Sequence, residues 1–442
     1  MKRFFLVLAL CAGFAWADDL EDGRAAYQAK DYVTAKAKFL AAAKTGDVRA
    51  QNGLGWLHDK GLGVAQDTRE AMKWYRLAAD RGNVFAQSRL AVAYARGDGV
   101  PQNNTESVRW NRMAAEQGFA DAQANLGWAY DQGLGIPQDF AEAVKWYRLA
   151  AEQGHPIAQS NLGQMYGNGQ GVQQDYKEAV KWYTLAAAQG FADAQANLGW
   201  VHAQGYSVPV DYREAAKWYR LAADQGHAAA QANLGWLYDK GLGVAQDYQE
   251  AVQWYRRAAD LGYALAQYGL GVAYQYGRGV QANPVVAYAL YSLSSANDPS
   301  ASNEATARRE GLVPTLSLAE IAAAQALTRE LTVAGTVTTV LNNFVASYVP
   351  EKKAVKLAAV EQKPVAKADA VVQATPPAPA PAASDDGFPE RPAQREGMLS
   401  CNTRCVNAAC WRTYDDGKKI KFRAQRKYNA STRQWELDSG GC

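Results

Sequence analysis

Histidines and paired carboxylates are the side chains in this sequence most suited to metal binding or proton transfer. The histidines stand far apart, and no zinc-type spacing links any of them. Acidic pairs such as Asp67 with Glu70 have the three-residue spacing of helix caps and recur through most of the chain. We therefore interpret these pairs as caps and predict no metal site. The histidines are His58, His155, His202 and His227.

Catalytic and nucleotide-binding motifs are missing from the sequence. It contains no Ser-x-x-Lys, Gly-x-Ser-x-Gly or His-Glu-x-x-His motif, no phosphate-binding glycine-rich loop and no dinucleotide fingerprint. The recurring Gly-x-Gly triplets have the composition of tight turns. The sequence thus predicts a protein that is not an enzyme, with no catalytic residues, no cofactor-binding residues and no cofactor.

Four of the five cysteines lie close to the C-terminal end, and the fifth, Cys11, lies in an N-terminal leader. An even number of clustered cysteines in an exported chain predicts two disulfides, in any of three pairings. Their spacing fits known zinc patterns poorly. The disulfide candidates are Cys401, Cys405, Cys410 and Cys442.

The leader has the three parts of a cleavable secretory signal. Two basic residues precede an apolar run at residues 4–14, and Ala15 and Ala17 provide the small residues before a cleavage site. The run is about half as long as a membrane-spanning helix, and no later segment is apolar enough to span. We expect residues 1–17 to be removed and the mature protein to be periplasmic or secreted, without a transmembrane segment.

Glycines recur with a period of 36 residues, and this repeat organises most of the chain. It defines seven units over residues 47–298. The periodic glycines are Gly46, Gly82, Gly118, Gly154, Gly190, Gly226 and Gly262.

The formal net charge of the chain is +3, and the units show no basic face of the density that nucleic acids require. We therefore expect no nucleic-acid partner.

Each unit predicts two antiparallel helices. In the third unit an apolar stripe from Ala122 to Tyr130 indicates the first helix, and a turn rich in glycine and proline follows at residues 133–137. Asp139 is expected to cap a second helix, which carries Trp146 and Tyr147 toward the core. Because one such pair cannot bury both apolar faces, successive pairs must stack into a solenoid.

The repeated pattern Ala-Gln, Leu-Gly, Gly-x-Gly-Val, Asp, Glu-Ala, Trp-Tyr, Ala-Ala and Gly closely resembles the Sel-one-like repeat family, which is related to the tetratricopeptide repeats. This resemblance implies an all-α fold, a right-handed α/α superhelical solenoid of helix-turn-helix repeats. It also implies an adaptor for other proteins, as found in several bacterial envelopes. A cysteine-rich branch of the family is linked to β-lactam binding or hydrolysis, but the repeats of this chain contain no cysteine.

The segments outside the repeats predict caps and a tail. Residues 18–46 resemble a shortened unit that caps the start of the array, and residues 299–349 supply closing helices, with 333–349 open between strand and helix. A Pro/Ala/Lys-rich linker is expected at 350–392. Residues 393–442 predict a small, disulfide-linked, β-rich module.

Tryptophans at the tenth position of a unit are the candidate partner-binding residues. This position lies some 200° around the first helix from a core leucine, at about 100° per residue, and should point away from the core onto the concave face. The alternative is that neighbouring repeats cover these rings. The candidate tryptophans are Trp56, Trp128, Trp200 and Trp236.

We expect an exported scaffold that binds a protein partner. The alternatives are a protein that binds the cell wall, peptidoglycan or another glycan, or a cell-wall or β-lactam hydrolase.

Overall fold

The computed structural model describes residues 19–298, 302–333 and 336–348, and the backbone of five short strands between residues 401 and 438. The chain divides into two compact units, Met1–Asp385 and Asp386–Cys442. The expected signal peptide 1–17, the expected linker 350–392 and the side chains of the tail cysteines lie outside the described residues.

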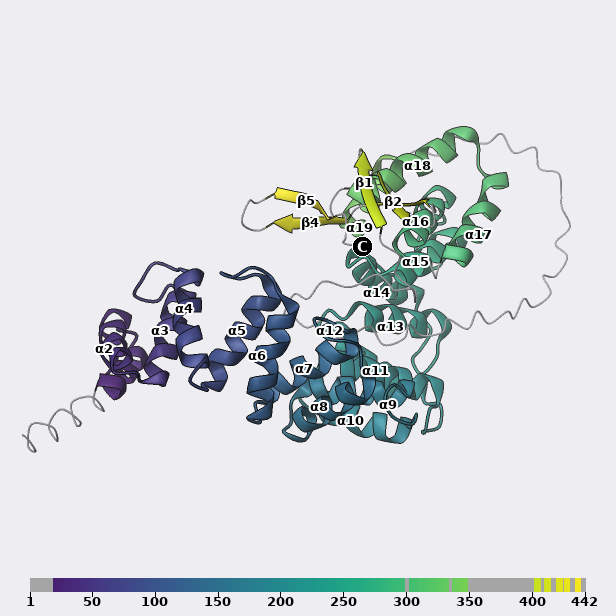
Figure 1. Cartoon of the computed structure of the whole chain (residues 1–442). Coiled ribbons are helices and arrows are strands. Elements are labelled where there is room, and N and C mark those ends of the chain that lie inside the picture. The colour runs from purple at the N-terminus through teal and green to yellow at the C-terminus, as the bar shows by residue number, and fades with distance from the viewer. Residues whose placement is uncertain are drawn as a thin grey trace, which may run out of the picture. The chain divides into compact units, whose positions relative to one another are not determined.

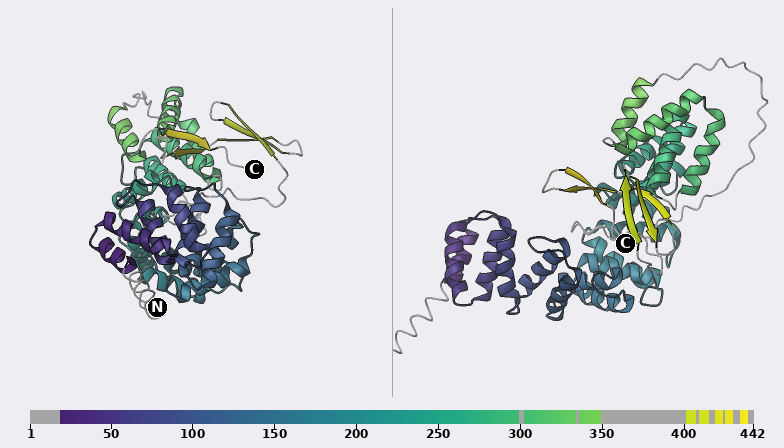
Figure 2. Two further views of the ribbon diagram at one scale, coloured as in Figure 1. Left: turned by 60° about the vertical axis from the view of Figure 1, so that its left-hand side comes forward. Right: turned by 45° about the horizontal axis from the view of Figure 1, so that its top comes forward.

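Helical hairpins follow one another through the first unit, which is an all-helical repeat solenoid as the sequence predicts (Figures 1 and 2). Each hairpin corresponds to one repeat. They are formed by α3 (Val48–Lys60) and α4 (Thr68–Ala79), α5 (Val84–Arg96) and α6 (Asn104–Glu116), α7 (Ala120–Gln132) and α8 (Phe140–Glu152), α9 (Pro156–Asn168) and α10 (Tyr176–Ala188), α11 (Ala192–Gln204) and α12 (Tyr212–Asp224), α13 (Ala228–Lys240) and α14 (Tyr248–Asp260), and α15 (Ala264–Tyr276) and α16 (Pro284–Asn297).

The capping and turn residues shape each hairpin in the predicted way. The Asp139 carboxylate accepts hydrogen bonds from the backbone N–H groups of Ala141 and Glu142, both at 3.0 Å, and so satisfies donors that α8 leaves free. Helix α7 ends at Gly133, whose φ of +65° lies in the left-handed region that glycine enters at little cost. The chain therefore reverses between α7 and α8.

A second turn glycine allows neighbouring hairpins to touch. A Cβ atom at Gly135 would lie 2.3 Å from the carbonyl carbon of Asn104, the first residue of α6 in the preceding hairpin. No side chain fits at that distance, so this turn requires glycine at position 135 where it meets α6. Ser207 takes the equivalent place in the fifth hairpin and has a φ of +61°.

Alanines, leucines and, in every hairpin except the second, one tyrosine of the second helix form the core. Tyr75, Tyr147 and Tyr183 are fully buried on the second helices, and Leu126 is fully buried on a first helix. The tryptophans beside these tyrosines were also expected in the core. Trp110 and Trp254 are buried, but four of them are only half-buried, and Lys or Arg groups cover the faces of some rings. The half-buried ones are Trp74, Trp146, Trp182 and Trp218.

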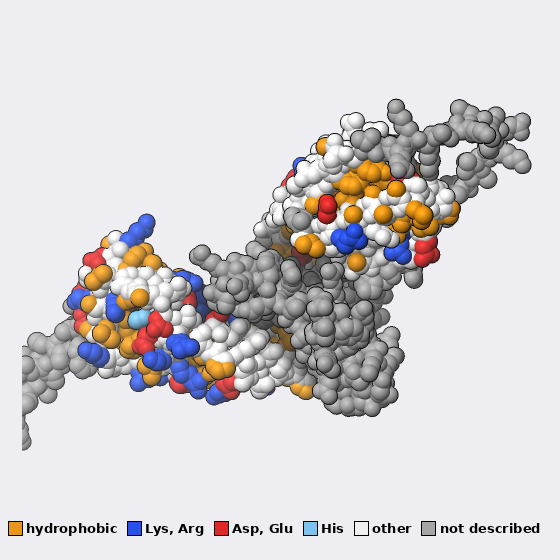
Figure 3. Space-filling model, turned by 90° about the horizontal axis from the view of Figure 1, so that it is seen from above, with side chains coloured by type: hydrophobic (Ala, Val, Ile, Leu, Met, Phe, Trp, Pro, Cys, Tyr) orange, Lys and Arg blue, Asp and Glu red, His pale blue; other side chains and the backbone are white. Residues whose placement is uncertain are grey.

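Additional helices close both ends of the array. Residues 19–28 are helical and precede α2 (Tyr32–Lys44), and after α16 come α17 (Ser302–Leu312), the short 3-10 helix η1 (Val313–Thr315), α18 (Leu318–Val333) and α19 (Val337–Ser347). Helix α18 packs against α16, and α19 packs against α14 and α18. The segment that the sequence left open between strand and helix thus contains a helix. Figure 3 shows hydrophobic side chains gathered over this closing part of the first unit.

The start of α18 has a capping box. The backbone N–H of Ser317 donates to the Glu320 carboxylate at 2.7 Å, and the backbone N–H of Glu320 donates to the Ser317 hydroxyl at 3.2 Å. Helix α19 is anchored to the sixth hairpin, because the backbone N–H of Thr338 donates to the Asp260 carboxylate at 2.7 Å.

The described residues of the second unit form five strands in antiparallel pairs. Strands β1 (Cys401–Val406), β2 (Ala409–Tyr414) and β3 (Lys419–Arg423) form one sheet in that order, and β4 (Gln425–Asn429) pairs with β5 (Gln434–Asp438). The register places Cys405 opposite Cys410 in the backbone ladder. The predicted disulfides themselves lie outside the described residues and stay a prediction.

Candidate partner-binding surface

The first helices of the hairpins line the inner side of the array. Helix α11 contacts α13, and α13 contacts α15, although a second helix separates each pair in the sequence. Helices that approach across a repeat in this way lie on the inner side of a curved stack. Each first helix also buries one side against its own second helix, as Ala122, Leu126 and Gly127 show for α7. The opposite side is therefore the surface that a partner can reach.

This opposite side consists of the third, seventh, tenth and fourteenth positions of each repeat, which align at helical spacing. We call these residues the inner face. In the order of the repeats they are Arg49, Gly53, Trp56 and Lys60; Phe85, Arg89, Val92 and Arg96; Asp121, Asn125, Trp128 and Gln132; Ile157, Asn161, Gln164 and Asn168; Asp193, Asn197, Trp200 and Gln204; Ala229, Asn233, Trp236 and Lys240; and Leu265, Gly269, Val272 and Tyr276.

The four predicted tryptophans all lie on the inner face and are half-buried. Neighbouring groups hold Trp56, whose indole N–H donates to the Tyr27 hydroxyl at 2.8 Å. The Lys60 ammonium and the Arg89 guanidinium each lie 5.0 Å from its ring centre. Neighbouring side chains therefore cover part of this ring and leave the rest accessible. Its role in binding stays a prediction.

The other three predicted tryptophans have aromatic or aliphatic neighbours. Trp128 packs against the core cluster of the third and fourth hairpins. Trp200 packs against two core clusters, one of the fourth and fifth hairpins and one of the fifth and sixth. The ring centres of Trp200 and Tyr206 are 5.0 Å apart, and those of Trp236 and Tyr212 are 6.2 Å apart. The structure does not bring the four tryptophans into one cluster, because each belongs to a different hairpin of the series.

Buried glutamines tie each hairpin to the one before it. The side-chain amide N–H of Gln123 donates to the backbone carbonyl of Ala115 at 3.1 Å, and its oxygen accepts from Gln153 at 2.7 Å. The same relay recurs at the equivalent residues of other repeats, for example from Gln189 to Gln159 at 2.8 Å. The Ala-Gln pair at the start of each unit was the sequence signal for this contact, but its role as a link was not foreseen.

Two histidines link hairpins beside the inner face. The His155 Nδ1 atom accepts from the backbone N–H of Ala158 at 3.2 Å and so caps α9, while its Nε2 atom lies 3.4 Å from the Asp121 carboxylate. His227 makes the same pair of contacts, with Asp193 at 3.3 Å. The hydrogen bond from His155 lowers the pKa of Asp121. From the sequence these histidines were predicted only not to form a metal site, and their contacts between hairpins were not foreseen.

Some inner-face amides also serve the core. Asn161 hydrogen-bonds the hydroxyl of Tyr147, and Asn233 hydrogen-bonds that of Tyr219. Burial raises the pKa of both tyrosines well above the ordinary value, so both stay protonated hydrogen-bonding groups. The middle of the inner face is therefore amide-rich, and part of its hydrogen-bonding capacity holds the hairpins together.

The described residues show no arrangement for metal chemistry or membrane crossing. No three His, Cys, Asp or Glu side chains among them are grouped to hold a metal ion. In the same part of the chain, no helix combines the length and the apolar character that a bilayer crossing needs. What the inner face offers is aromatic rings, amides and charges, which are groups for recognition.

Comparison with known proteins agrees with this architecture. The family model described as Sel1 repeat matches residues 48–83, 84–119, 120–155, 156–191, 192–227, 228–263 and 264–299. No curated protein sequence matches the chain significantly.

Solved structures of repeat proteins are similar to this chain. A Sel1 repeat protein from Oxalobacter formigenes is 35% identical over 55% of this chain and 96% of its own, with a TM-score of 0.51. A protective antigen of uropathogenic Escherichia coli that displays an SLR fold is 27% identical over 75% of this chain and 84% of its own, with a TM-score of 0.45. Seven consecutive matches over more than half of its length show that this chain belongs to the Sel1 repeat family, whose helical solenoids typically act as scaffolds for protein–protein interaction.

Proposed function

We propose that this protein is an exported scaffold that holds a protein partner on the inner face of its helical array. The proposal rests on one observation: along the first helices, the residue type is constant at a core position but varies from repeat to repeat on the inner face. The core position occupied by Leu126 is leucine in every repeat, whereas the inner face changes among charged, amide, aliphatic and aromatic residues. A backbone that repeats while its surface chemistry varies suits the recognition of one particular partner.

The half-buried tryptophans give this surface its anchor points. Tryptophan is enriched among the few interface residues that carry most of the binding energy. Trp128 and Trp200 are held by neighbouring hairpins while part of each ring stays accessible. A side chain held in this way loses less conformational freedom on binding than a mobile one, which favours affinity.

The test is crosslinking of the full-length protein in its native cells, followed by identification of captured proteins by mass spectrometry. Replacing Trp128 and Trp200 together by alanine should abolish capture of the main partner while the helical circular-dichroism signal is retained. The control replaces Leu149 and Leu185 by alanine; these exposed leucines lie on second helices, away from the inner face. Equal capture by the two variants would contradict the proposal, and so would unfolding of the tryptophan variant.

Export is the second part of this proposal and rests on the leader at residues 1–17. We expect the mature protein in the periplasmic or secreted fraction with Asp18 at its N-terminus. Cell fractionation and N-terminal sequencing test this, with replacement of the apolar run at residues 4–14 as the control that should block processing. A full-length, unprocessed chain in the cytoplasmic fraction would contradict it.

A cell-wall glycan is the second candidate partner, and one aromatic cluster favours it. The Tyr176 and Tyr206 rings are stacked with centres 4.4 Å apart, and the Trp200 ring lies 6.4 Å from Tyr176. All three rings are partly exposed, and aromatic faces of this kind pack well against the apolar C–H face of a sugar. Cosedimentation with purified peptidoglycan separates the candidates: a Tyr206→Ala variant should lose pelleting if a glycan is the ligand.

A further inference from the structure

Aromatic side chains gather along the inner face from the fourth to the sixth hairpin. The ring centre of Tyr176, the first residue of α10, lies 6.4 Å from that of Trp200 on α11. One repeat later, the ring centres of Tyr212 and Trp236 lie 6.2 Å apart. Tyr206 adds a third ring to the first pair, because it stacks on Tyr176 with ring centres 4.4 Å apart. We call these five partly exposed residues the aromatic surface.

The equivalent positions of the other complete boundaries between hairpins do not hold two aromatic residues. Two aromatic pairs at successive boundaries are therefore a property of the fourth to sixth hairpins and not of the repeat itself. The equivalent pairs elsewhere are Thr68 and Val92, Asn104 and Trp128, Phe140 and Gln164, and Tyr248 and Val272.

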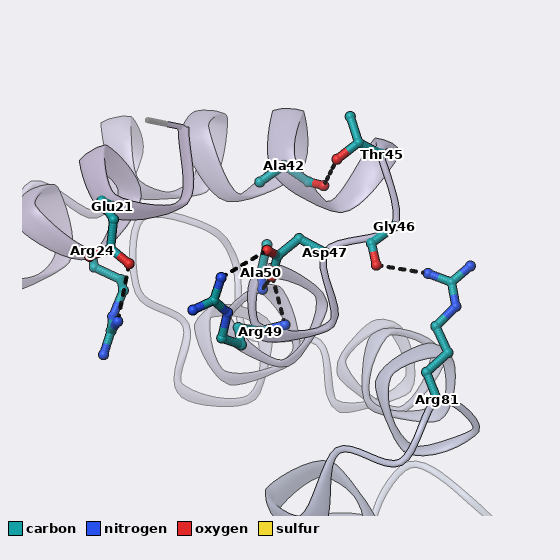
Figure 4. Close-up of polar contacts among 9 residues, drawn as sticks. All are labelled: Glu21, Arg24, Ala42, Thr45, Gly46, Asp47, Arg49, Ala50 and Arg81. Carbon is teal, nitrogen blue, oxygen red and sulfur yellow. Dashed lines mark hydrogen bonds and ion pairs between the residues drawn. The ribbon is translucent and has the colours of Figure 1, made fainter. Parts of the chain in front are cut away.

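Tyr32 and Trp56, at the start of the array, are the same pair of residue types in a different setting. The Arg89 guanidinium lies 5.0 Å from the centre of the Trp56 ring and covers part of it. At the same end of the array, the Arg81 guanidinium donates to the backbone carbonyl of Gly46 at 3.0 Å (Figure 4). Guanidinium groups thus contact a ring and a carbonyl at this end, whereas the rings of the aromatic surface contact one another.

The aromatic surface lies in a part of the inner face that carries little charge. At the inner-face positions of the fourth to sixth repeats the charged residues are Asp193 and Lys240, and both have partners. The Asp193 carboxylate lies 3.3 Å from the His227 imidazole. The Lys240 ammonium lies 3.1 Å from the Asp239 carboxylate. An uncharged ligand with apolar groups therefore fits this surface better than an ionic one.

The repeat of the rings suits the pitch of a polyproline II helix. Helix α11 contacts α13, so Trp200 and Trp236 lie on neighbouring first helices. Helices packed in this way lie about 8–10 Å apart, and a polyproline II helix completes one turn of three residues in about 9 Å. Prolines three residues apart can therefore meet successive aromatic pairs. Aromatic-lined grooves recognise proline-rich segments in this way.

The chain itself contains a segment of this class. Residues 370–384 include Pro376, Pro377, Pro379 and Pro381 and contain no Lys, Arg, Asp or Glu. Pro376 and Pro379 are separated by one turn of a polyproline II helix. The segment lies outside the described residues, and its composition is that of a polyproline II ligand.

The attachment of this segment favours it over a free ligand. Helix α19, after which the linker begins, packs against α14, the helix paired with α13 in the sixth hairpin. Pro376 follows the end of α19 by about 30 residues, and a random coil of that length spans roughly 30 Å. Tethering over such a distance gives an effective concentration on the order of millimolar. The segment can therefore reach the aromatic surface and outcompete a dilute ligand of the same class.

We propose that the aromatic surface binds the proline-rich segment 370–384 of the same chain as a polyproline II helix, with Pro376 and Pro379 on its two aromatic pairs. This contact anchors the linker to the array and goes beyond the proposed scaffold function. It also makes the surface selective, because a partner or a glycan that uses Trp200 must displace the tethered segment.

The experiment measures fluorescence anisotropy of a labelled peptide of residues 370–384, titrated with the mature full-length protein. The variant P376S/P379S should bind the peptide about tenfold more tightly than the native protein, because its own tethered segment no longer competes. The matched control is P364S/P389S, which changes two prolines of the linker outside the segment and should bind the peptide as the native protein does.

The second comparison changes the aromatic surface in the P376S/P379S protein. Adding Y206Q/Y212T should weaken peptide binding about tenfold or more, because two ring faces are lost. The control is Y130H/Y166H, which changes two half-buried tyrosines bonded to arginines of second helices and should leave peptide binding unchanged. If Y206Q/Y212T does not fold, the comparison of P376S/P379S with the native protein still decides, because it leaves the repeats unchanged. Other repeats already have the new residues at the equivalent positions, as Gln170 and Thr68, and as His58 and His202 for the control.

Four results would overturn the inference. The first is equal binding of the peptide by the native protein and P376S/P379S, and the second is equal weakening by Y206Q/Y212T and Y130H/Y166H. The third is binding of peptidoglycan but not of the peptide, lost in Y206Q/Y212T, which would assign the surface to a glycan. The fourth is a native dimer in sedimentation that P376S/P379S converts into a monomer, which would place the segment on a second copy. Failure of the scaffold function is distinguishable, because Y206Q/Y212T keeps Trp128 and Trp200 and should still capture the cellular partner.

Discussion

Two glycines in one helix provide a direct test of how the hairpins pack. Both Gly163 and Gly167 are buried in α9, four residues apart on the same side. A Cβ atom at Gly163 would lie 2.7 Å from two ring carbons of the buried Tyr183. A Cβ atom at Gly167 would meet nothing closer than the Tyr183 hydroxyl at 3.7 Å. The same chemical change therefore meets two different environments against one tyrosine.

The expected magnitudes follow from these distances. Replacing glycine by alanine in a helix gains about 0.4–1 kcal/mol wherever the new methyl group fits. At Gly167 it fits, so Gly167→Ala should stabilise the protein by that amount. At Gly163 carbon atoms that need about 3.5–4.0 Å would be forced to 2.7 Å. Overpacking of this kind costs about 1–3 kcal/mol, so Gly163→Ala should fall about 1–3 kcal/mol below Gly167→Ala in stability.

Urea unfolding followed by far-ultraviolet circular dichroism measures the difference between the two variants. A double-mutant cycle with Tyr183→Asn then isolates the clash, because the smaller side chain should relieve part of the cost of Gly163→Ala. The second repeat already has this combination, with Ala91 and Asn111 at the equivalent positions. Equal stability of Gly163→Ala and Gly167→Ala, or no coupling in the cycle, would refute the packing argument.

Three further predictions concern a turn, an ion pair and the tail. Ser207→Gly should raise the free energy of unfolding by about 0.5–1 kcal/mol, because Ser207 has a φ of +61° that glycine adopts without strain; an unchanged urea midpoint would contradict this. The pKa of Asp121 is lowered in the folded protein, so this carboxylate contributes stability that is present above its unfolded pKa of about 3.9 and is lost as the pH falls through the lower folded pKa. The variant Asp121→Asn should therefore lose less stability than the native protein when the pH falls below about 4. Parallel curves of stability against pH for the two proteins would exclude that role. The four cysteines of the mature chain should give no free thiol before reduction and four after it, whereas four reactive thiols in the native protein would exclude the disulfides.

The repeat architecture could be predicted from the sequence because its signals are local. A helix cap needs only a short polar side chain and the three residues after it, as at Asp139, and a left-handed turn needs only glycine, as at Gly133. One set of these signals defines a hairpin, and the set recurs every 36 residues. The hairpins must then stack, because a single hairpin cannot bury its apolar faces. The same reasoning placed leucine and tyrosine in the core correctly.

What the sequence could not decide depends on contacts between repeats. A helical wheel of one repeat treats Trp56 as exposed and Trp146 as core, yet both are half-buried. For Trp56 the cover comes from another repeat, because Arg89 of the next hairpin lies over its ring. The hydrogen bond from Gln123 to the Ala115 carbonyl and the contact of His155 with Asp121 likewise join residues of successive hairpins. The sequence determines which residues each hairpin presents, and tertiary stacking determines how much of each side chain a partner can reach.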